Sequence, residues 1–465
     1  MKKIIIILFL VFTNNTIYSQ KSKKIDTLLL TYEKANQFSG SVLVAEKGNI
    51  IFEKSYGYRN TKTKEKNTNS SIYRIYSTTK IFTATVILKL EEQGRLSLND
   101  KLSKYYPDYP KGDSITIANM LSHTSGIPDG DLAEITINEE ALLKDISEKP
   151  LNFSPGKSWG YSNVNYYLLG YIIKKITGIE YDKVIEDIVL NPLQMNNSGF
   201  HFNDLKNENK ALGYEFMSGK NSNEALQFKT DHPFAAGAMY STVEDLYKFS
   251  AAIKKGEILN KKTVDKAQTP FLNDHYGFGY DIQKILNKNT IGHSGVGPGY
   301  RCQFFKILED DITIIILVNS EMVPMNIAEK ITGIMTDNAY EINKIPKISK
   351  NHLQKIEGVY SSKDGNFYLK NINGMLVFSG GNMPRIPLTP TSKNTFNFGE
   401  QFKVYFKTTP TEEIESVSID DTYQGIKNAN KVSDTFPWGI IGTATSSGCM
   451  GKILHYKKIR LIYII

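Results

Sequence analysis

Residues 77–90 of the chain read STTKIFTATVILKL. From Lys80 to Leu90 the apolar residues recur at helical spacing, and Gly94 supplies a stop signal. This pattern predicts a buried helix. Because residues three apart are neighbours on a helix, the Ser-x-x-Lys motif at its start places the Ser77 hydroxyl and the Lys80 ammonium on one face.

The Ser-x-x-Lys motif is a weak signal by itself, since a chain rich in Ser and Lys contains such matches by chance. A second match, Ser154 to Lys157, falls in a Pro-Gly turn with no helix after it. Ser77 also has a purely structural interpretation, as an N-cap serine whose oxygen accepts a helix N–H. The motif therefore needs support from other segments.

Length and composition favour a globular protein with more than one module. The chain has 465 residues, of which 40% are hydrophobic and 22% charged, so two domains are expected. Its formal net charge is +8, but no Lys/Arg stripe alternates with aromatic residues. Solubility and attraction to anionic envelope surfaces explain this charge better than nucleic-acid binding does.

The first 20 residues have the pattern of a secretory signal peptide. Lys2 and Lys3 precede the apolar run from Ile4 to Phe12, and Ser19-Gln20 is a plausible cleavage site. The run is too short to span a bilayer as a helix. We therefore expect an exported protein, periplasmic or secreted, with no stable membrane span after signal cleavage.

Strand and helix patterns alternate in a way that predicts an α+β fold. Helical patterns fill most of the region between residues 102 and 290, with strand patterns before and after it, so a helical lobe is expected to interrupt one sheet. The expected strands are Gly40 to Phe52 as a hairpin, Gly277 to Ile282, Arg301 to Leu308 and Ile312 to Val318. The expected domains are a catalytic domain over 21–343, a small all-β barrel or sandwich over 350–425, and a tail of uncertain structure over 428–465.

Three motifs together resemble one family. Ser77-Thr78-Thr79-Lys80 is followed by Tyr161-Ser162-Asn163 and then by His293-Ser294-Gly295, which is expected to precede a strand. This order resembles the serine β-lactamase and penicillin-binding-protein superfamily, particularly its class C branch with esterases and D-peptide hydrolases. The flanking segments Ile117 to Asp129 and Ala235 to Phe249 are similar as well, and the likeness runs from about Lys34 to Ile342.

The resemblance implies a β-lactamase-like antiparallel sheet flanked by helices, and an acyl-enzyme mechanism. Ser77 would be the nucleophile, and Lys80 with Tyr161 would activate it. The residues alone leave open whether a tyrosinate or a neutral lysine takes the proton. Backbone N–H groups of Ser77 and Val296 would bind the oxyanion, and Asn163 would orient Lys80 and the substrate amide.

His293 departs from the lysine that is common in β-lactamases at this position. A histidine with an ordinary pKa of about 6.5 is mostly neutral at pH 7, so a substrate carboxylate would be held weakly. Ser294 and Gly295 complete this substrate-binding segment. Arg301 could supply the missing charge or could simply be a solvated residue at the start of a strand. Ester or D-amino-acid peptide hydrolysis, of the D-alanyl-D-alanine carboxypeptidase type, is therefore expected above β-lactam hydrolysis.

Other classes of protein receive less support. The Gly-x-Ser-x-Gly elbow of α/β-hydrolases is absent, and no histidine falls in a metal-ligand spacing, so neither metal nor cofactor is expected. Cys302 and Cys449 are assigned to different modules, which argues against a disulfide. A class C-like β-lactamase, or a catalytically silent relative that binds cell wall or β-lactams, remains an alternative. The expected partner is a small-molecule or peptide substrate, and peptides derived from peptidoglycan belong to this class.

Overall fold

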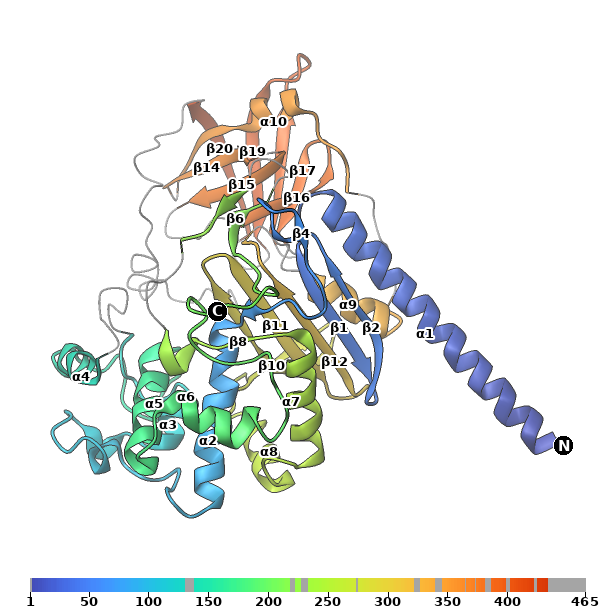
Figure 1. Cartoon of the computed structure of the whole chain (residues 1–465). Helices are drawn as coiled ribbons and strands as arrows, with labels where there is room; N and C mark the ends of the chain where they lie inside the picture. The colour runs from blue at the N-terminus through green and yellow to red at the C-terminus, as the bar shows by residue number, and fades with distance from the viewer. Residues whose placement is uncertain are drawn as a thin grey trace.

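The computed structural model describes residues 2–129, 138–217, 222–226, 233–272, 275–321, 327–338, 345–363, 365–372, 374–380, 386–398, 402–421 and 425–433. Its centre is a six-stranded antiparallel sheet in the order β2-β1-β12-β11-β10-β9 (Figure 1). The strands are β1 (Gly40–Glu46), β2 (Asn49–Tyr56), β9 (Asp281–Ile285), β10 (Lys288–Gly297), β11 (Tyr300–Ile307) and β12 (Ile312–Val318).

Strand β12 is buried along its whole length because both faces of the sheet are covered. Ile315 and Leu317 belong to the core under the helical lobe, whereas Ile314, Ile316 and Val318 belong to a second core on the opposite face. Side chains of a strand alternate between the two faces, so an uninterrupted apolar run is what a doubly covered strand requires.

The helical lobe is inserted between β2 and β9, as the sequence predicts. Its helices are α2 (Thr79–Glu92), α3 (Ile117–Leu121), α4 (Glu139–Ser147), α5 (Asn163–Thr177), α6 (Tyr181–Ile185), α7 (Val243–Lys255) and α8 (Lys261–Ala267). Helix α2 is buried on almost every side, from Thr79 to Leu88. The α+β fold class and the helix following Ser77 are confirmed.

Helix α1 (Lys2–Lys34) spans the expected cleavage site, and its C-terminal part packs on the outer face of the sheet (Figure 1). Ile25, Leu28, Leu29 and Tyr32 recur at helical spacing and are buried with the apolar residues of β2 and α9 (Ile327–Met335). Among the described residues, no helix combines the length and apolar character that a membrane span needs. The signal peptide stays a prediction.

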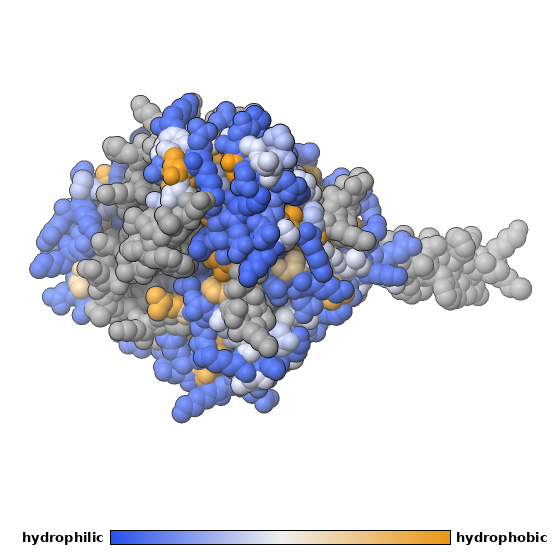
Figure 2. Space-filling view, turned by 90° about the horizontal axis from the view of Figure 1, so that it is seen from above, coloured by the Kyte–Doolittle hydropathy of each residue, from blue (hydrophilic) through white to orange (hydrophobic). Residues whose placement is uncertain are grey.

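The C-terminal module is a closed antiparallel barrel, which decides between the two all-β forms expected. It follows α10 (Lys350–Ile356) and consists of β13 (Gly358–Ser362), β14 (Gly365–Ile372), β15 (Met375–Gly380), β16 (Ile386–Ser392), β17 (Thr395–Phe398), β18 (Phe402–Thr408), β19 (Ile414–Asp421) and β20 (Gly425–Ser433). Aromatic and aliphatic side chains fill its interior. Its outer surface, seen in Figure 2, is mainly hydrophilic with scattered hydrophobic residues.

Three expected boundaries differ from the structure. Residues 428–433, which the sequence assigns to a tail, belong to β20 and close the barrel by pairing with β13; residues 434–465, including Cys449, lie outside the described residues. The strand expected at Gly277 to Ile282 begins only at Asp281, because Gly277 to Tyr280 form an irregular turn with Gly279 at φ +81°. The segment His293-Ser294-Gly295 lies within β10, not before a strand.

Replacing Leu317 by Ala should destabilise the protein by about 2–5 kcal/mol, because it removes a fully buried side chain from the central strand. Chemical denaturation of the two proteins measures the difference. Ile50→Ala, at a half-exposed position of β2, is the control and should change stability by less than about 0.5 kcal/mol. Equal losses for both variants would contradict this account of the core.

Candidate active site

The backbone in front of Ser77 is held in an unusual conformation. Tyr76, Ser77 and Thr78 form a short 3-10 turn that leads into α2, and Tyr76 has φ +43°. The left-handed region is costly for a bulky residue and is maintained only where the surroundings enforce it. Here the Tyr76 hydroxyl donates a hydrogen bond to Pro298 O at 3.0 Å.

The structure brings together the three side chains expected to carry the chemistry. Lys80 Nζ lies 3.1 Å from Ser77 Oγ, and the Tyr161 hydroxyl donates to the same oxygen at 3.1 Å. The N-cap residue of α2 is Thr78, and its side chain makes no capping hydrogen bond. Ser77 is therefore not a helix cap, and its hydroxyl faces an amine and a phenol.

Lys80 is fully buried and has two further oxygen partners. Its Nζ lies 2.8 Å from Asn163 Oδ1 and 2.8 Å from Ala236 O. Burial lowers the pKa of Lys80 to about 7, although the Asp129 and Asp281 carboxylates oppose this shift. A substantial fraction of Lys80 is therefore neutral near pH 7.

A neutral Lys80 fits its three neighbours well. Two N–H bonds can donate to Asn163 Oδ1 and Ala236 O, both of which only accept, and the lone pair then faces the Ser77 hydroxyl. Loss of hydration, the largest cause, raises the pKa of Tyr161 well above its ordinary value, although the Ser77 hydrogen bond opposes this. The sequence left open whether a Tyr161 tyrosinate or a neutral Lys80 accepts the Ser77 proton. The directions of the two pKa shifts favour the neutral lysine.

Asp129 fixes the orientation of the Asn163 amide. Its carboxylate accepts hydrogen bonds from Asn163 N at 2.7 Å, from Asn163 Nδ2 at 3.2 Å and from Val164 N at 3.3 Å. With Nδ2 committed to Asp129, Oδ1 points to Lys80. These contacts lie at the first turn of α5, where backbone N–H groups lack helical acceptors.

Strand β10 passes directly beside Ser77. A methyl group on Gly295 would overlap Ile75 O and would lie 3.2 Å from Ser77 N, and one on Gly297 would overlap the Tyr76 ring. Only glycine permits this approach. Val296 stands between the two glycines, and Ser294 is buried on the other side of Gly295.

The His293 side chain is buried and turned toward the protein. Its Nδ1 lies 2.6 Å from Ser294 O and its Nε2 lies 3.1 Å from the Tyr276 hydroxyl. The carbonyl can only accept, so Nδ1 carries the proton and Nε2 accepts from the tyrosine. Burial lowers the pKa of His293 to about 3, so this position carries no cation at neutral pH.

Arg301 is committed to the turn between β10 and β11. The sequence allows it either to bind a substrate carboxylate or to stand in solvent. In the structure it is half-buried, and Nη1 donates to Gly297 O at 2.7 Å and to Tyr300 O at 2.8 Å. The guanidinium thus braces the turn that follows Gly295 and Val296.

Several residues around the site were not assigned a role from the sequence. His123 is fully buried, and its ring centroid lies 4.3 Å from that of Tyr161 and 4.8 Å from that of Tyr276. Trp159 extends this aromatic wall toward His275, with centroids 4.7 Å apart. Asp129 and His123 carried a usable signal, because both lie in the family-like segment from Ile117 to Asp129.

Burial also raises the pKa of Asp281 to about 7, with the Lys80 charge opposing the shift. Asp281 is the first residue of β9, whereas the sequence pattern placed it near the end of a strand from Gly277 to Ile282.

Within the described part of the chain, no cluster of three His, Cys, Asp or Glu side chains could hold a metal ion. Cys302 is a free, buried thiol.

The geometry agrees with a comparison against known families. The family model described as Beta-lactamase matches residues 29–330, which include every residue of the site. The chain belongs to the β-lactamase family.

Relatives of this β-lactamase-family chain include penicillin-binding proteins. One, from Bacillus subtilis, is 31% identical over 327 residues, which are 65% of this chain and 72% of the relative. The solved structure of an octameric penicillin-binding protein homologue from Pyrococcus abyssi is 26% identical with a TM-score of 0.64, covering 88% of this chain and 99% of its own. A D-amino acid amidase from Ochrobactrum anthropi SV3 shares the fold at 22% identity and a TM-score of 0.60, covering 68% of this chain and 99% of its own.

Gly295→Ala should lower the rate at which a fluorophosphonate labels the protein by about a hundredfold, comparable to the loss of an oxyanion-binding donor. The added methyl group must push β10 away from Ile75 and Ser77. Labelling followed on a gel over time measures this rate. Gly48→Ala, in the open turn between β1 and β2, is the control; wild-type labelling by Gly295→Ala would show that the close approach is unimportant.

Proposed function

We propose that this β-lactamase-family chain is a serine hydrolase that acts through an acyl-enzyme on Ser77. The observation that carries the proposal is the position of Ser77 Oγ, 3.1 Å from both Lys80 Nζ and the Tyr161 hydroxyl. A serine hydroxyl needs an adjacent base to become a good nucleophile. The buried amine, with its lowered pKa, supplies that base.

Acylation follows from these contacts. Neutral Lys80 accepts the Ser77 proton as Oγ forms a bond to the substrate carbonyl carbon, and the backbone N–H groups of Ser77 and Val296 receive the negative charge on the carbonyl oxygen. Tyr161 donates its proton as the bond to the leaving group breaks, and the Lys80 ammonium then returns a proton to Tyr161. Water releases the acyl group by the same route.

The substrate is an ester or an amide, and we rank aryl esters and D-amino-acid peptides above β-lactams. The support is the neutral, inward-facing His293 together with Arg301, whose Nη1 serves the backbone of a turn. A free carboxylate on a substrate therefore meets no cation at His293, which favours substrates without a carboxylate, such as aryl esters. Peptides derived from peptidoglycan are the proposed natural partners, with the enzyme exported by the signal in residues 1–20.

Ser77→Ala should lower ester turnover by more than about a thousandfold and should abolish fluorophosphonate labelling, since the nucleophile itself is lost. The control is Ser154→Ala, which removes the exposed serine of the second Ser-x-x-Lys motif and should react like wild type. Labelling that survives Ser77→Ala would refute the assignment. Wild-type protein that is never labelled and turns over no substrate would favour a silent, binding relative.

The rate of acylation should rise as the pH passes through about 7, because Lys80 acts as a base only when it is neutral. His293, with a pKa near 3, stays neutral over this range. Asp281 titrates in the same range, so the profile of kcat/KM against pH should be measured for Asp281→Asn as well. The rise should persist in that variant; its disappearance would assign the titration to Asp281.

A panel with a short-chain aryl ester, a D-Ala-D-Ala peptide and a chromogenic cephalosporin, at one enzyme concentration, separates the substrate classes. We expect the aryl ester to be hydrolysed faster than the cephalosporin, because the ester has no carboxylate, whereas the cephalosporin carboxylate meets an uncharged His293. Fastest turnover of the cephalosporin would instead favour a class C-like β-lactamase.

A further inference from the structure

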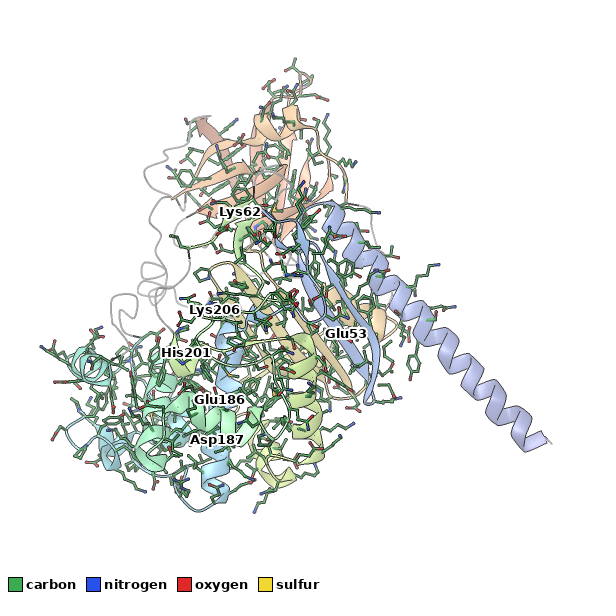
Figure 3. All side chains as sticks on the ribbon, in the orientation of Figure 1. Glu53, Lys62, Glu186, Asp187, His201 and Lys206 are labelled. Atoms are coloured by element: carbon green, nitrogen blue, oxygen red, sulfur yellow. The ribbon has the colours of Figure 1, made fainter. Side chains whose placement is uncertain are left out.

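A small hairpin connects the barrel with the edge of the active site. It consists of β6 (Tyr214–Phe216) and β7 (Asn223–Glu224), and β6 lies at the underside of the barrel (Figure 1). Lys62, labelled in Figure 3 at the same level, pairs with Glu224 at 2.7 Å. Both partners are largely exposed, so this ion pair stabilises the hairpin little.

The stronger attachment to the barrel is apolar. Along β15 the side chains alternate, so that Leu376 and Phe378 fill the barrel while Met375 and Val377 point outward. The two outward residues are nevertheless only 7% and 3% exposed, and Phe216 packs against them. Burial of this outward pair therefore ties the end of β6 to the barrel.

The other end of β6 holds the turn between β10 and β11. Glu321 N donates to Tyr214 O at 2.9 Å, and the Glu321 carboxylate accepts from Gly299 N at 2.8 Å. A methyl group on Gly213 would overlap the Tyr300 ring, so β6 packs tightly on this turn. Through Pro298 the same turn accepts the hydrogen bond from Tyr76, the neighbour of Ser77.

We propose that the barrel positions the catalytic strand β10, and that Phe216 is the positioning residue that links them. The contacts run from Met375 and Val377 to Phe216, along β6 to Glu321, and from Glu321 to the turn that follows Val296. The barrel touches no reacting atom in this scheme. It acts by holding the oxyanion-binding strand at the correct distance from Ser77, and the proposal rests on the acyl transfer proposed above.

The test compares full-length Phe216→Ala, Met375→Ala and the double variant with wild type. Phe216→Ala should lower kcat for the aryl ester about tenfold with little change in KM, since small displacements of catalytic groups reduce rates strongly. The double variant should be no slower than the slower of the two single variants, because the two substitutions remove the same contact between Phe216 and β15. Phe216→Leu, which keeps an apolar contact, should recover most of the rate.

Two controls locate the effect. Val432→Ala truncates an apolar residue exposed on the barrel surface and should leave kcat unchanged. Glu321→Ala should lower kcat as Phe216→Ala does, whereas Glu321→Gln keeps an acceptor for Gly299 and should be nearly normal. Wild-type kcat in Phe216→Ala, or additive losses in the double variant, would overturn the positioning role while leaving Ser77 labelling, and thus the proposed function, intact. Wild-type protein without Ser77-dependent turnover would instead defeat the proposed function.

Discussion

The Lys80 amine lies in the protein interior, within hydrogen-bonding distance of Ser77 Oγ, Asn163 Oδ1 and Ala236 O. An unpaired ammonium at such a depth is costly, and only well-oriented oxygen atoms can offset the loss of water. The three oxygens come from three separate segments of the chain. Their arrangement fixes how α2, α5 and the turn at Ala236 pack against one another.

The same constraint explains the polar and aromatic surroundings of this amine. Asp129 holds the Asn163 amide in one orientation, so the lysine always meets an acceptor and never the amide nitrogen. Rings of His123, Tyr161 and Tyr166 pack around the site and exclude water. A low dielectric then strengthens each remaining polar contact and also favours the uncharged lysine.

The sequence predicted those helices and strands whose residue pattern was strong and local. The helical spacing after Lys80 and the apolar run of β12 each specify an element by themselves, and both were predicted correctly. The strand containing Gly295 was misjudged because glycine has low strand propensity. Glycine stands at this place in β10 because a larger side chain would overlap Ile75. The strands β6 and β7 have three and two residues, too few for any periodicity.

Contacts between distant residues were the least accessible from the sequence. Nothing near Phe216 in the sequence indicates that it packs against β15. Likewise, nothing near Asp129 indicates that its carboxylate binds the first turn of α5. In both cases the partner is set by tertiary packing, which one sequence does not encode in a local pattern. The family motifs pointed to Ser77, Lys80 and Tyr161 but not to the residues that hold them in place.

The closed form of the barrel has a further consequence for the behaviour of the molecule in concentrated solution. Because β20 pairs with β13, every strand of this module has two hydrogen-bonded neighbours. The described strands of this module therefore offer no free backbone edge onto which a second molecule could add a strand. The central sheet, as far as the chain is described, has β2 and β9 as its outer strands. The charged side chains of Glu53, Lys54 and Lys284 on these two strands discourage the addition of another strand.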